Sequence, residues 1–326
     1  MTNNVFITGA SSGLGLSHAI YLTSKGFNVT GTTRKADQLD LTVLKEIYIR
    51  DHTRYKFVDK NKTRVKPSKV IIPDNIRSDL INHLKQIDFI TMDITDIKSV
   101  KKVVDEQIRI DILINNAGFG YFGSIEELTL EMAKYQFDVN FFGFIRVLQE
   151  IIPNMRQNMN GRIINTASLG GISCIPFQAH YSASKAAILI LTEGLRVELK
   201  PFNIFVSSLV PGDINTAFDA NTVISHNHTK SVSSIDIADL KDSIPVLPDS
   251  PYYERANIAW NSIIQNLIVS PPPITVSKKI EKIIRAKRPK IHYKVGSRLQ
   301  TQGVTLIKRL LPENISSRIV AMFYGL

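Results

Sequence analysis

The chain has a single cysteine and no long hydrophobic run, and both absences exclude classes of protein. Cys174 is alone among 326 residues, so an intrachain disulfide is impossible and we expect a reducing, cytoplasmic environment. No stretch approaches the roughly 18 uninterrupted apolar residues of a transmembrane helix. The first apolar run, at residues 5–7, reaches Thr8 and Gly9 at once, so we expect no signal peptide.

Acidic residues are scarce in the last sixth of the chain. Residues 271–326 hold twelve Lys or Arg residues and two Glu residues, which gives +10 of the total net charge of +11. This asymmetry favours an anionic partner such as a phospholipid surface, although a solvated basic face would have the same composition. No nucleic-acid-binding module is visible, so we expect no nucleic acid partner, and we expect no metal site.

The apolar content of 44% is sufficient for a large core, and its pattern alternates strands with helices. Residues 4–8 predict a strand, 9–15 a glycine-rich turn, 14–25 a helix and 27–33 a second strand, which together form a βαβ unit. Further strands are predicted at 87–92, 112–114, 161–166 and 204–209, with helices at 96–108, 125–155 (long and bent) and 181–199. The sequence therefore predicts an α/β fold, a Rossmann-type doubly wound parallel sheet in a single domain over residues 1–326.

Three segments do not follow this alternation. Residues 35–86 predict an inserted helix, hairpin and helix, because a structureless loop of that length is uncommon in a compact domain. Residues 213–274 have a weak period and many Ser, Asn and Pro residues, so we interpret them as a mobile substrate flap with short helices. After a basic helix at 276–287 and a strand at 290–295, residues 303–326 predict a basic and apolar C-terminal extension of one or two short helices.

Tyr181 and Lys185 open the apolar helical run at 181–191. At a spacing of four residues, both side chains lie on one face of a helix. A tyrosine alone keeps its proton up to about pH 10, and a neighbouring ammonium group brings the phenol toward the range of a general acid or base. A surface tyrosine near a surface lysine has the same spacing, so the pair alone does not decide between structure and catalysis.

Residues 8–15 combine three glycines with two serines, directly after a strand and at the start of a helix. Such a turn lets the backbone approach a pyrophosphate, and the helix N-terminus offers unpaired amides. The second strand ends in Thr33-Arg34-Lys35 and lacks the acid that would bond the ribose 2′-hydroxyl of NAD. Arg34 can clamp a 2′-phosphate instead, so we predict NADP (NADPH) as the cofactor, with NAD less favoured. The structural alternative is that Arg34 only faces solvent.

Several motifs occur in the order and spacing of one family. They are Gly9-x-x-x-Gly13-x-Gly15, Asn115-Asn116-Ala117-Gly118, Ser168, Tyr181-x-x-x-Lys185 and Pro211-Gly212. Each is weak alone, but in register they resemble the short-chain dehydrogenase/reductase family, in its core type. The resemblance covers roughly residues 1–34, 87–215 and, more weakly, 275–326, whose pattern is weakly similar to the steroid and retinol dehydrogenase subgroup. It implies an NAD(P)-dependent enzyme acting on CH–OH groups, and a homo-oligomer.

The resemblance also implies roles for individual residues. Tyr181 would be the general acid/base, and Lys185 would lower the pKa of that tyrosine and bond the nicotinamide ribose. Ser168 would bond the substrate oxygen, and Asn140 would hold a water for proton relay. The implied cofactor contacts are Gly9, Ser11, Ser12, Gly13, Leu14, Gly15, Arg34, Asp93, Asn116, Ala117, Gly118, Tyr181, Lys185, Pro211, Gly212 and Thr216.

Two functions remain open. The first is an NADP-dependent oxidoreductase that interconverts a ketone or aldehyde and an alcohol on an apolar substrate. The apolar class rests on residues near the expected flap that could equally be core, namely Phe177, Phe218, Trp260, Ile263, Ile264 and Leu267. The second is a peripheral membrane or lipid-binding protein that uses the NADP-binding fold as a sensor. It rests on basic side chains of the tail together with apolar ones, namely Leu306, Ile307, Leu310, Ile319, Val320, Met322 and Phe323.

Overall fold

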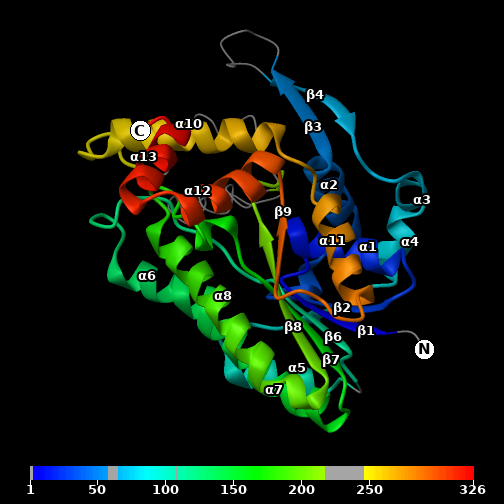
Figure 1. Cartoon of the computed structure of the whole chain (residues 1–326). Helices are drawn as coiled ribbons and strands as arrows, with labels where there is room; N and C mark the ends of the chain where they lie inside the picture. Colours follow the sequence, from blue (N-terminus) through cyan, green and yellow to red (C-terminus); the bar gives the residue numbers. More distant parts are fainter. Residues whose placement is uncertain (1–2, 58–64, 108, 217–245) are drawn as a thin grey trace.

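A seven-stranded parallel sheet forms the centre of the structure, a computed structural model that describes residues 3–57, 65–107, 109–216 and 246–326 (Figure 1). The strands follow the spatial order β5-β2-β1-β6-β7-β8-β9, and every neighbouring pair is parallel. Their bounds are β1 Asn4–Thr8, β2 Asn28–Thr33, β5 Asp88–Thr91, β6 Ile112–Asn115, β7 Gly161–Thr166, β8 Ile204–Pro211 and β9 His292–Val295. The predicted Rossmann-type doubly wound sheet is confirmed.

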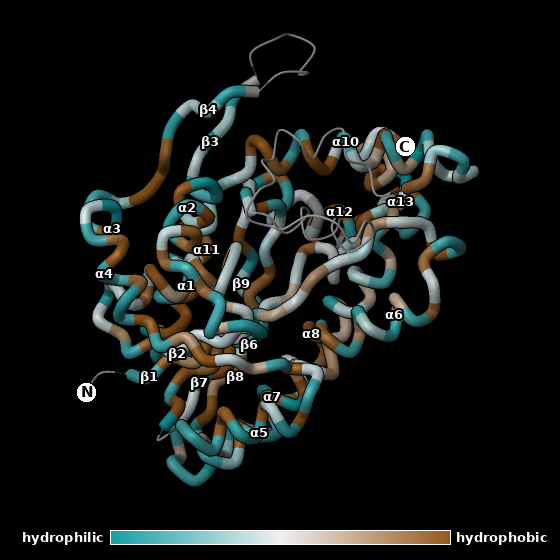
Figure 2. Tube along the Cα trace, turned by 180° about the vertical axis from the view of Figure 1, so that it is seen from behind, coloured by the Kyte–Doolittle hydropathy of each residue, from teal (hydrophilic) through white to brown (hydrophobic). Residues whose placement is uncertain are grey.

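Helices cover both faces of the sheet, and each face has its own core. Along β1, Val5 and Ile7 belong to one core cluster and Phe6 to the other, because successive side chains of a strand point to opposite faces. The first cluster is covered by α1 (Gly13–Thr23), α2 (Leu41–Asp51), α4 (Leu80–Lys85) and α11 (Ile274–Arg285). The second is covered by α5 (Ile97–Asp105), α7 (Gly143–Gln157) and α8 (Ala179–Glu198). Figure 2 shows hydrophobic stretches along the central strands and hydrophilic ones at the outer turns.

The segment at 35–86 forms the expected helix, hairpin and helix. The antiparallel hairpin of β3 (Thr53–Phe57) and β4 (Val65–Val70) follows α2, and the short α3 (Asp74–Arg77) precedes α4. The Asp40 carboxylate caps α2, since it accepts the Thr42 amide at 2.6 Å and the Val43 amide at 3.4 Å. Helices α2 and α4 both pack into the core cluster that contains α1. The segment is therefore part of the layer that covers the cofactor half of the sheet.

The predicted long, bent helix at 125–155 consists of α6 (Leu130–Phe137), a π-helical turn (Asp138–Phe142) and α7. The Thr129 hydroxyl caps α6, because it accepts the Met132 amide at 3.2 Å. A π-helical turn carries one extra residue and re-aims the side chains that follow it, and it is frequent at functional sites. Here it contains Asn140.

The described part of the expected flap is one long helix rather than several short ones. Helix α10 (Tyr253–Val269) buries one side, which carries Ala256, Ala259, Trp260, Ile263, Ile264 and Leu267. This spacing of apolar residues has the helical period, so the expectation of short helices at 253–269 is wrong. Residues 217–245 of the expected flap lie outside the described residues.

The C-terminal extension forms two short helices, as predicted, with a break at Pro312. A π-helical segment (Leu299–Val304) leads into α12 (Thr305–Leu310), and α13 (Glu313–Phe323) follows. Both helices lie beside α10 above the strand ends of the sheet (Figure 1). Across the described ranges, no helix combines the length and the hydropathy that crossing a bilayer requires.

Candidate active site

The turn between β1 and α1 has a backbone that only glycine permits at several points. Gly9 and Gly13 have φ angles of 68° and 52°, in the left-handed region that favours glycine. A Cβ on Gly15 would lie 2.0 Å from the Gly9 carbonyl oxygen, and a Cβ on Gly9 would lie 2.9 Å from Ala117 Cα. The turn is therefore closed against itself and against the end of β6.

Short polar side chains hold this turn to the neighbouring strand. The Thr8 hydroxyl accepts the amides of Asn116 at 2.8 Å and Ala117 at 3.0 Å. In return, Asn116 Nδ2 donates to the carbonyl oxygens of Thr8 at 3.1 Å and Gly9 at 3.3 Å. The expected cofactor residues Asn116 and Ala117 thus form one bonded unit with the glycine turn, which keeps its backbone in place before a ligand binds.

At the end of β2, the side chains suit an anion. The Thr33 hydroxyl donates to Ser11 Oγ at 3.1 Å. Arg34 follows and is exposed, and within the described ranges no carboxylate forms an ion pair with it. The first turn of α1 has no acidic residue of its own. Asp93, after β5, binds the Thr95 amide at 2.8 Å and shapes the adjoining loop.

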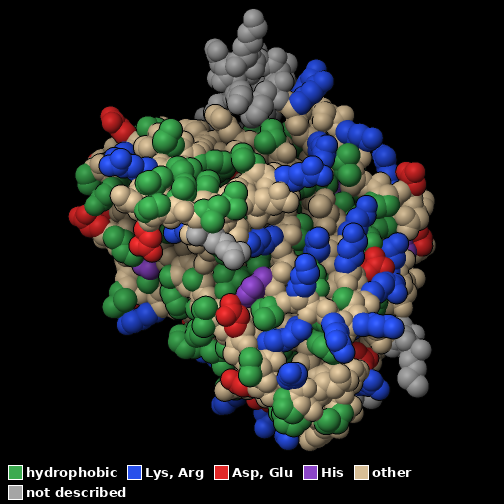
Figure 3. Space-filling view, viewed as in Figure 1, with side chains coloured by type: hydrophobic (Ala, Val, Ile, Leu, Met, Phe, Trp, Pro, Cys, Tyr) green, Lys and Arg blue, Asp and Glu red, His purple; other side chains and the backbone are tan. Residues whose placement is uncertain are grey.

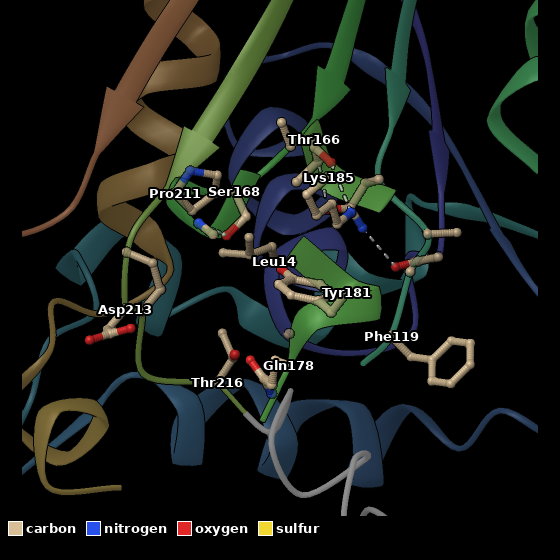
Figure 4. Close-up of a pocket in the computed structure, with 18 of the residues that line it drawn as sticks. Leu14, Phe119, Thr166, Ser168, Gln178, Tyr181, Lys185, Pro211, Asp213 and Thr216 are labelled. Atoms are coloured by element: carbon tan, nitrogen blue, oxygen red, sulfur yellow. Dashed lines mark hydrogen bonds between the residues drawn. The ribbon is translucent and has the colours of Figure 1, made fainter. Parts of the chain in front are cut away.

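Tyr181 and Lys185 lie one turn apart on α8, as the spacing predicts. Lys185 Nζ lies 5.8 Å from the centroid of the Tyr181 ring and donates to the Thr166 carbonyl oxygen at 3.0 Å. Its side chain is 3% exposed, and burial lowers the pKa of Lys185 to about 8. Figure 4 shows Ser168, Tyr181 and Lys185 converging on one part of the cavity.

Gly171, three residues after Ser168, lets α8 approach the turn that follows β7 closely. A Cβ on Gly171 would lie 2.7 Å from the Lys185 carbonyl carbon, so a larger residue there would push α8 away. Ser168 Oγ accepts the Gly170 amide at 3.0 Å and caps the short helical turn at Leu169–Gly171. The hydroxyl is thereby held at the end of β7, on the side of the cavity that faces Tyr181 (Figure 4).

Asn140 is fully buried and bonded to the loop after β6. Its Oδ1 accepts the Phe119 amide at 3.0 Å, and its Nδ2 donates to the Phe119 carbonyl at 2.8 Å and to Ser184 Oγ at 3.1 Å. A Cβ on Gly118 would lie 3.1 Å from Asn140 Oδ1 and 3.2 Å from Lys185 Nζ. The asparagine and the lysine, which belong to different helices, thus meet at the same point of the backbone.

One continuous cavity of about 960 Å³ joins these groups. Of the residues expected at the site, those that line it are Gly9, Ser11, Ser12, Gly13, Leu14, Arg34, Asp93, Asn116, Ala117, Gly118, Ser168, Tyr181, Lys185, Pro211, Gly212 and Thr216. Gly15 and Asn140 do not line it; they are buried behind its wall. Their contribution in the structure is to the shape of the wall.

The loop after β8 is held by a residue that the sequence did not reveal. Gln300, in the C-terminal π-helical segment, donates through Nε2 to the Asp213 carboxylate, and its Oε1 accepts the Asp213 amide at 3.3 Å. Burial raises the pKa of Asp213 to about 6. A Cβ on Gly212 would lie 2.7 Å from Gln300 Oε1, so this glycine admits the contact. No pattern in the sequence joins two positions so far apart.

The 35–86 segment supplies a second such residue. Asp51, at the end of α2, is 1% exposed and pairs with Arg50 at 3.0 Å. Burial raises the pKa of Asp51 to about 6, and its carboxyl also accepts the Gly13 amide of the glycine turn. The 35–86 segment therefore contacts and supports the glycine turn, which its sequence did not indicate.

The opposite end of the cavity is apolar and comes from the last quarter of the chain. Its wall is formed by Ile263, Leu267, Leu299, Ile307, Ile319, Val320 and Phe323. Of the apolar residues expected near the flap, Ile263 and Leu267 line the cavity, as do Ile307, Ile319, Val320 and Phe323 of the tail. Trp260 and Ile264 are instead core residues that cluster with Phe122, and Phe177 packs on that cluster. Phe218 lies outside the described residues.

A nicotinamide dinucleotide fits the donor set of this cavity. The glycine turn and the α1 N-terminus suit its pyrophosphate, since the N-terminus of a helix offers backbone amides and the first turn of α1 has no acidic residue of its own. Arg34 stands at one end and the Ser168, Tyr181 and Lys185 group at the other, so one extended ligand can reach both. Its chemistry would then take place beside the apolar wall.

Comparisons with known proteins agree with this geometry. A family model described as "short chain dehydrogenase" matches residues 68–226. The 3-ketodihydrosphingosine reductase of Bacteroides thetaiotaomicron is 30% identical over 323 residues, which cover 99% of this chain and 98% of that protein.

Two solved structures share the fold. A short-chain dehydrogenase from Streptomyces avermitilis is 22% identical with a TM-score of 0.64, covering 91% of this chain and 89% of that one. ElxO, solved with NADP bound, is 19% identical with a TM-score of 0.58, covering 90% of this chain and 97% of its own. At these identities, the two structures support the fold alone.

Proposed function

The chain belongs to the short-chain dehydrogenase/reductase family and is an NAD(P)-dependent oxidoreductase. We propose that it interconverts a ketone or aldehyde and an alcohol on an apolar, lipid-like substrate, with NADP as cofactor. One observation carries the proposal. A single cavity joins the Tyr181 and Lys185 pair to a wall of apolar side chains. A carbonyl within an apolar chain would therefore meet the acid/base group while its chain remains out of water.

Cofactor choice rests on the charge at the end of β2. Arg34 is exposed, lines the cavity beside Ser11 and Ser12, and has no acidic neighbour in the sequence from residue 30 to 36. Its planar guanidinium would bind the 2′-phosphate of NADP with two hydrogen bonds, and NAD lacks this phosphate. A relative of the same fold, ElxO, has been solved with NADP bound.

Four side chains of this chain would handle the proton and the substrate oxygen. When bound, the nicotinamide supplies or accepts the hydride. In reduction, the Tyr181 phenol donates its proton to the carbonyl oxygen, and in oxidation the tyrosinate takes the proton back. The Ser168 hydroxyl donates a hydrogen bond to the same oxygen and steadies its developing charge.

Lys185 and Asn140 act behind the tyrosine. The Lys185 ammonium lies one turn from Tyr181, where its charge favours the ionised phenol and can bond the cofactor ribose. Asn140 meets Lys185 at the Gly118 backbone and would hold the water that passes the proton on. Both residues are buried, so this route to solvent is confined to one path.

The lipid-like substrate class has two supports. The cavity that contains Tyr181 is also lined by isoleucine, leucine, valine and phenylalanine side chains from α10, α12 and α13. The relative from Bacteroides thetaiotaomicron, which matches almost end to end, acts by its name on 3-ketodihydrosphingosine, a long-chain amphiphile with a ketone. A long-chain ketone with a small polar head is therefore the first substrate to test.

The test is the consumption of NADPH with a panel of carbonyl compounds. The panel contains 3-ketodihydrosphingosine, a long-chain 3-oxoacyl ester, a long-chain aldehyde and a short water-soluble ketone. We expect kcat/KM to rise with chain length, and an absence of turnover on every long-chain compound would contradict the proposal.

Replacement of the acid/base group sharpens this test. Tyr181→Phe should lower kcat by roughly a thousandfold, because general acid catalysis contributes about 10² to 10⁴ in rate. NADPH binding, followed by fluorescence titration, should stay within about threefold, since the phenyl ring is retained. Substantial turnover in this variant would remove Tyr181 from the mechanism.

Two partners expected from the sequence stay proposals. A homo-oligomer is consistent with apolar side chains exposed on α8, where Ile190 and Val197 are 67% and 74% exposed, and light scattering would measure it. The proposal of an anionic membrane surface is supported by apolar side chains exposed on α12 and α13.

A further inference from the structure

Helices α12 and α13 expose several apolar side chains that do not line the cavity. Leu306 and Leu310, one turn apart on α12, are 59% and 66% exposed. On α13, Ile315 and Met322 are 43% and 76% exposed, and Arg318 lies between them at helical spacing on the same side. We call these five residues the outer ridge.

The inner side of the same two helices is also apolar, and it lines the cavity. Ile307 of α12 and Ile319, Val320 and Phe323 of α13 belong to the cavity wall. In the structure, the tail residues that made the sequence apolar therefore divide into two sets. A short helix pair with apolar side chains on both sides suits a boundary between two apolar environments, one of which is the substrate cavity.

The segment that carries the outer ridge is positively charged. From residue 297 to 326 the sequence contains a single acid, Glu313, against four basic residues. Arg298, Lys308 and Arg318 are all exposed. Figure 3 shows hydrophobic side chains over the region of α10, α12 and α13 and, on the same face, many Lys and Arg side chains over α11. An apolar ridge beside a basic field is complementary to an anionic bilayer surface.

We propose that the outer ridge docks the enzyme on an anionic phospholipid bilayer, with the leucine, isoleucine and methionine side chains in the headgroup region and the basic side chains on lipid phosphates. A second copy of the chain is the less favourable occupant, because two such basic faces would repel each other. In this orientation, two of the helices that line the cavity, α12 and α13, would lie against the bilayer. The proposal rests on the proposed function only for the substrate that the bilayer would deliver.

The experiment measures flotation of the full chain with vesicles, without cofactor or substrate. Vesicles of phosphatidylcholine alone are compared with vesicles that also contain phosphatidylglycerol, at low and high salt. Leu310→Ser/Met322→Ser removes two apolar side chains of the ridge that do not line the cavity. The matched control Ile97→Ser/Met159→Ser removes two exposed apolar side chains from α5 and the turn after α7, which lie on a distant part of the molecule.

A charge variant tests the second half of the surface. Arg298→Glu/Arg318→Glu reverses two exposed charges that do not line the cavity. We expect the intact chain and the control to float with the anionic vesicles at low salt. We expect each ridge variant to bind roughly tenfold more weakly. Turnover of a water-soluble ketone should be the same in all four proteins.

Three results would overturn the proposal. The first is an intact chain that does not float with anionic vesicles, and the second is a pair of ridge variants that bind as well as the control. The third is a dimer, measured by light scattering, that Leu310→Ser/Met322→Ser dissociates, which would make the ridge an interface between copies. Because flotation needs no turnover, a failure of the proposed activity in the ketone panel leaves this measurement intact, and the reverse also holds.

Discussion

At the cofactor end of the cavity, the walls are backbone and short polar side chains from one βαβ unit and the strand beside it. At the substrate end, they are long apolar side chains from three helices in the last quarter of the chain. At the first end, a Cβ added to Gly9 or Gly15 would lie less than 3 Å from neighbouring backbone atoms, so a larger residue would displace the backbone. The second end has side chains that can change size without changing the fold.

Because of this difference, the two ends tolerate different substitutions. A dinucleotide is held by amides and by a helix terminus, whose positions depend on φ angles that few residues adopt. An apolar chain is held by area and shape, which many combinations of side chains supply. We therefore expect single substitutions to cause large losses of ligand affinity at the cofactor end and small losses at the substrate end.

The largest effect is expected at Gly15. Gly15→Ala places a Cβ 2.0 Å from the Gly9 carbonyl oxygen and 2.8 Å from Asn116 Nδ2, so the turn must open. We expect the affinity for NADPH to fall at least roughly a hundredfold in fluorescence titration. Circular dichroism would establish that the variant is folded.

Gly194→Ala is the matched control. Its Cβ, on an exposed position of α8, would have Glu198 Oε1 at 3.8 Å as its nearest neighbour. Cofactor affinity should not change, and the free energy of unfolding should rise by up to about 1 kcal/mol, because alanine favours helix. Equal losses of affinity in the two variants would contradict the close-packed turn.

The next effect concerns the cofactor phosphate. Arg34→Asp should reverse the preference between NADPH and NADH by roughly fiftyfold, because it removes a charge-assisted bond to the 2′-phosphate and adds repulsion. The ratio of kcat/KM for the two cofactors measures this. The ratio for Arg34→Leu, which only removes the charge, should lie between the ratios for the wild type and for Arg34→Asp. An unchanged ratio in Arg34→Asp would mean that Arg34 only faces solvent and does not contact the cofactor.

Lys185 links the site to stability. Since burial lowers the pKa of Lys185 to about 8, the folded state binds fewer protons than the unfolded chain from about pH 8 up to the ordinary lysine pKa. The cost of burying the charge is complete below pH 8 and decreases as pH rises through this window. Relative to Lys185→Met, the wild type should gain about 2 kcal/mol in unfolding free energy between pH 7.5 and 10. Urea titrations at the two pH values measure it, and a constant difference would mean that the lysine is not desolvated.

The smallest effect is expected at the substrate end. Gln300→Ala removes the hydrogen bonds to Asp213, and the loop after β8 should become less well placed. We expect KM for a long-chain ketone to rise roughly fivefold, about the value of one neutral hydrogen bond, while kcat changes less. Gln302→Ala, an exposed position in the same segment, should leave KM unchanged. A loss as sharp as that of Gly15→Ala would remove the contrast between the two ends.

Much of the cofactor end could be predicted from the sequence because its contacts are local. Gly9, Gly13 and Gly15 lie within seven positions, and Tyr181 and Lys185 are one turn apart, so spacing alone predicts their geometry. The doubly wound parallel sheet could be predicted for a similar reason, since strands that alternate with helices along the chain imply a parallel sheet covered on both faces. The helix, hairpin and helix of residues 35–86 were also readable from periodicity.

The substrate end could be predicted from the sequence only in part. The expected apolar set near the flap mixed cavity residues such as Ile263 with core residues such as Trp260, because a hydrophobic pattern identifies a buried side of a helix and not what it is buried against. The same limit applied to the tail. Its apolar residues divide between the cavity and the outer ridge according to how α12 and α13 are docked.

The parallel α/β sheet, the glycine turn and the pairing of Tyr181 with Lys185 were predictable from the sequence, because each depends on residues close together in the chain. The support of the glycine turn by Asp51 and the contact of Gln300 with Asp213 became visible only in the folded structure. The same is true of the apolar wall, which α12 and α13 share with α10. These contacts join positions far apart in sequence, and no local preference of the backbone specifies which distant side chain will fill a given place.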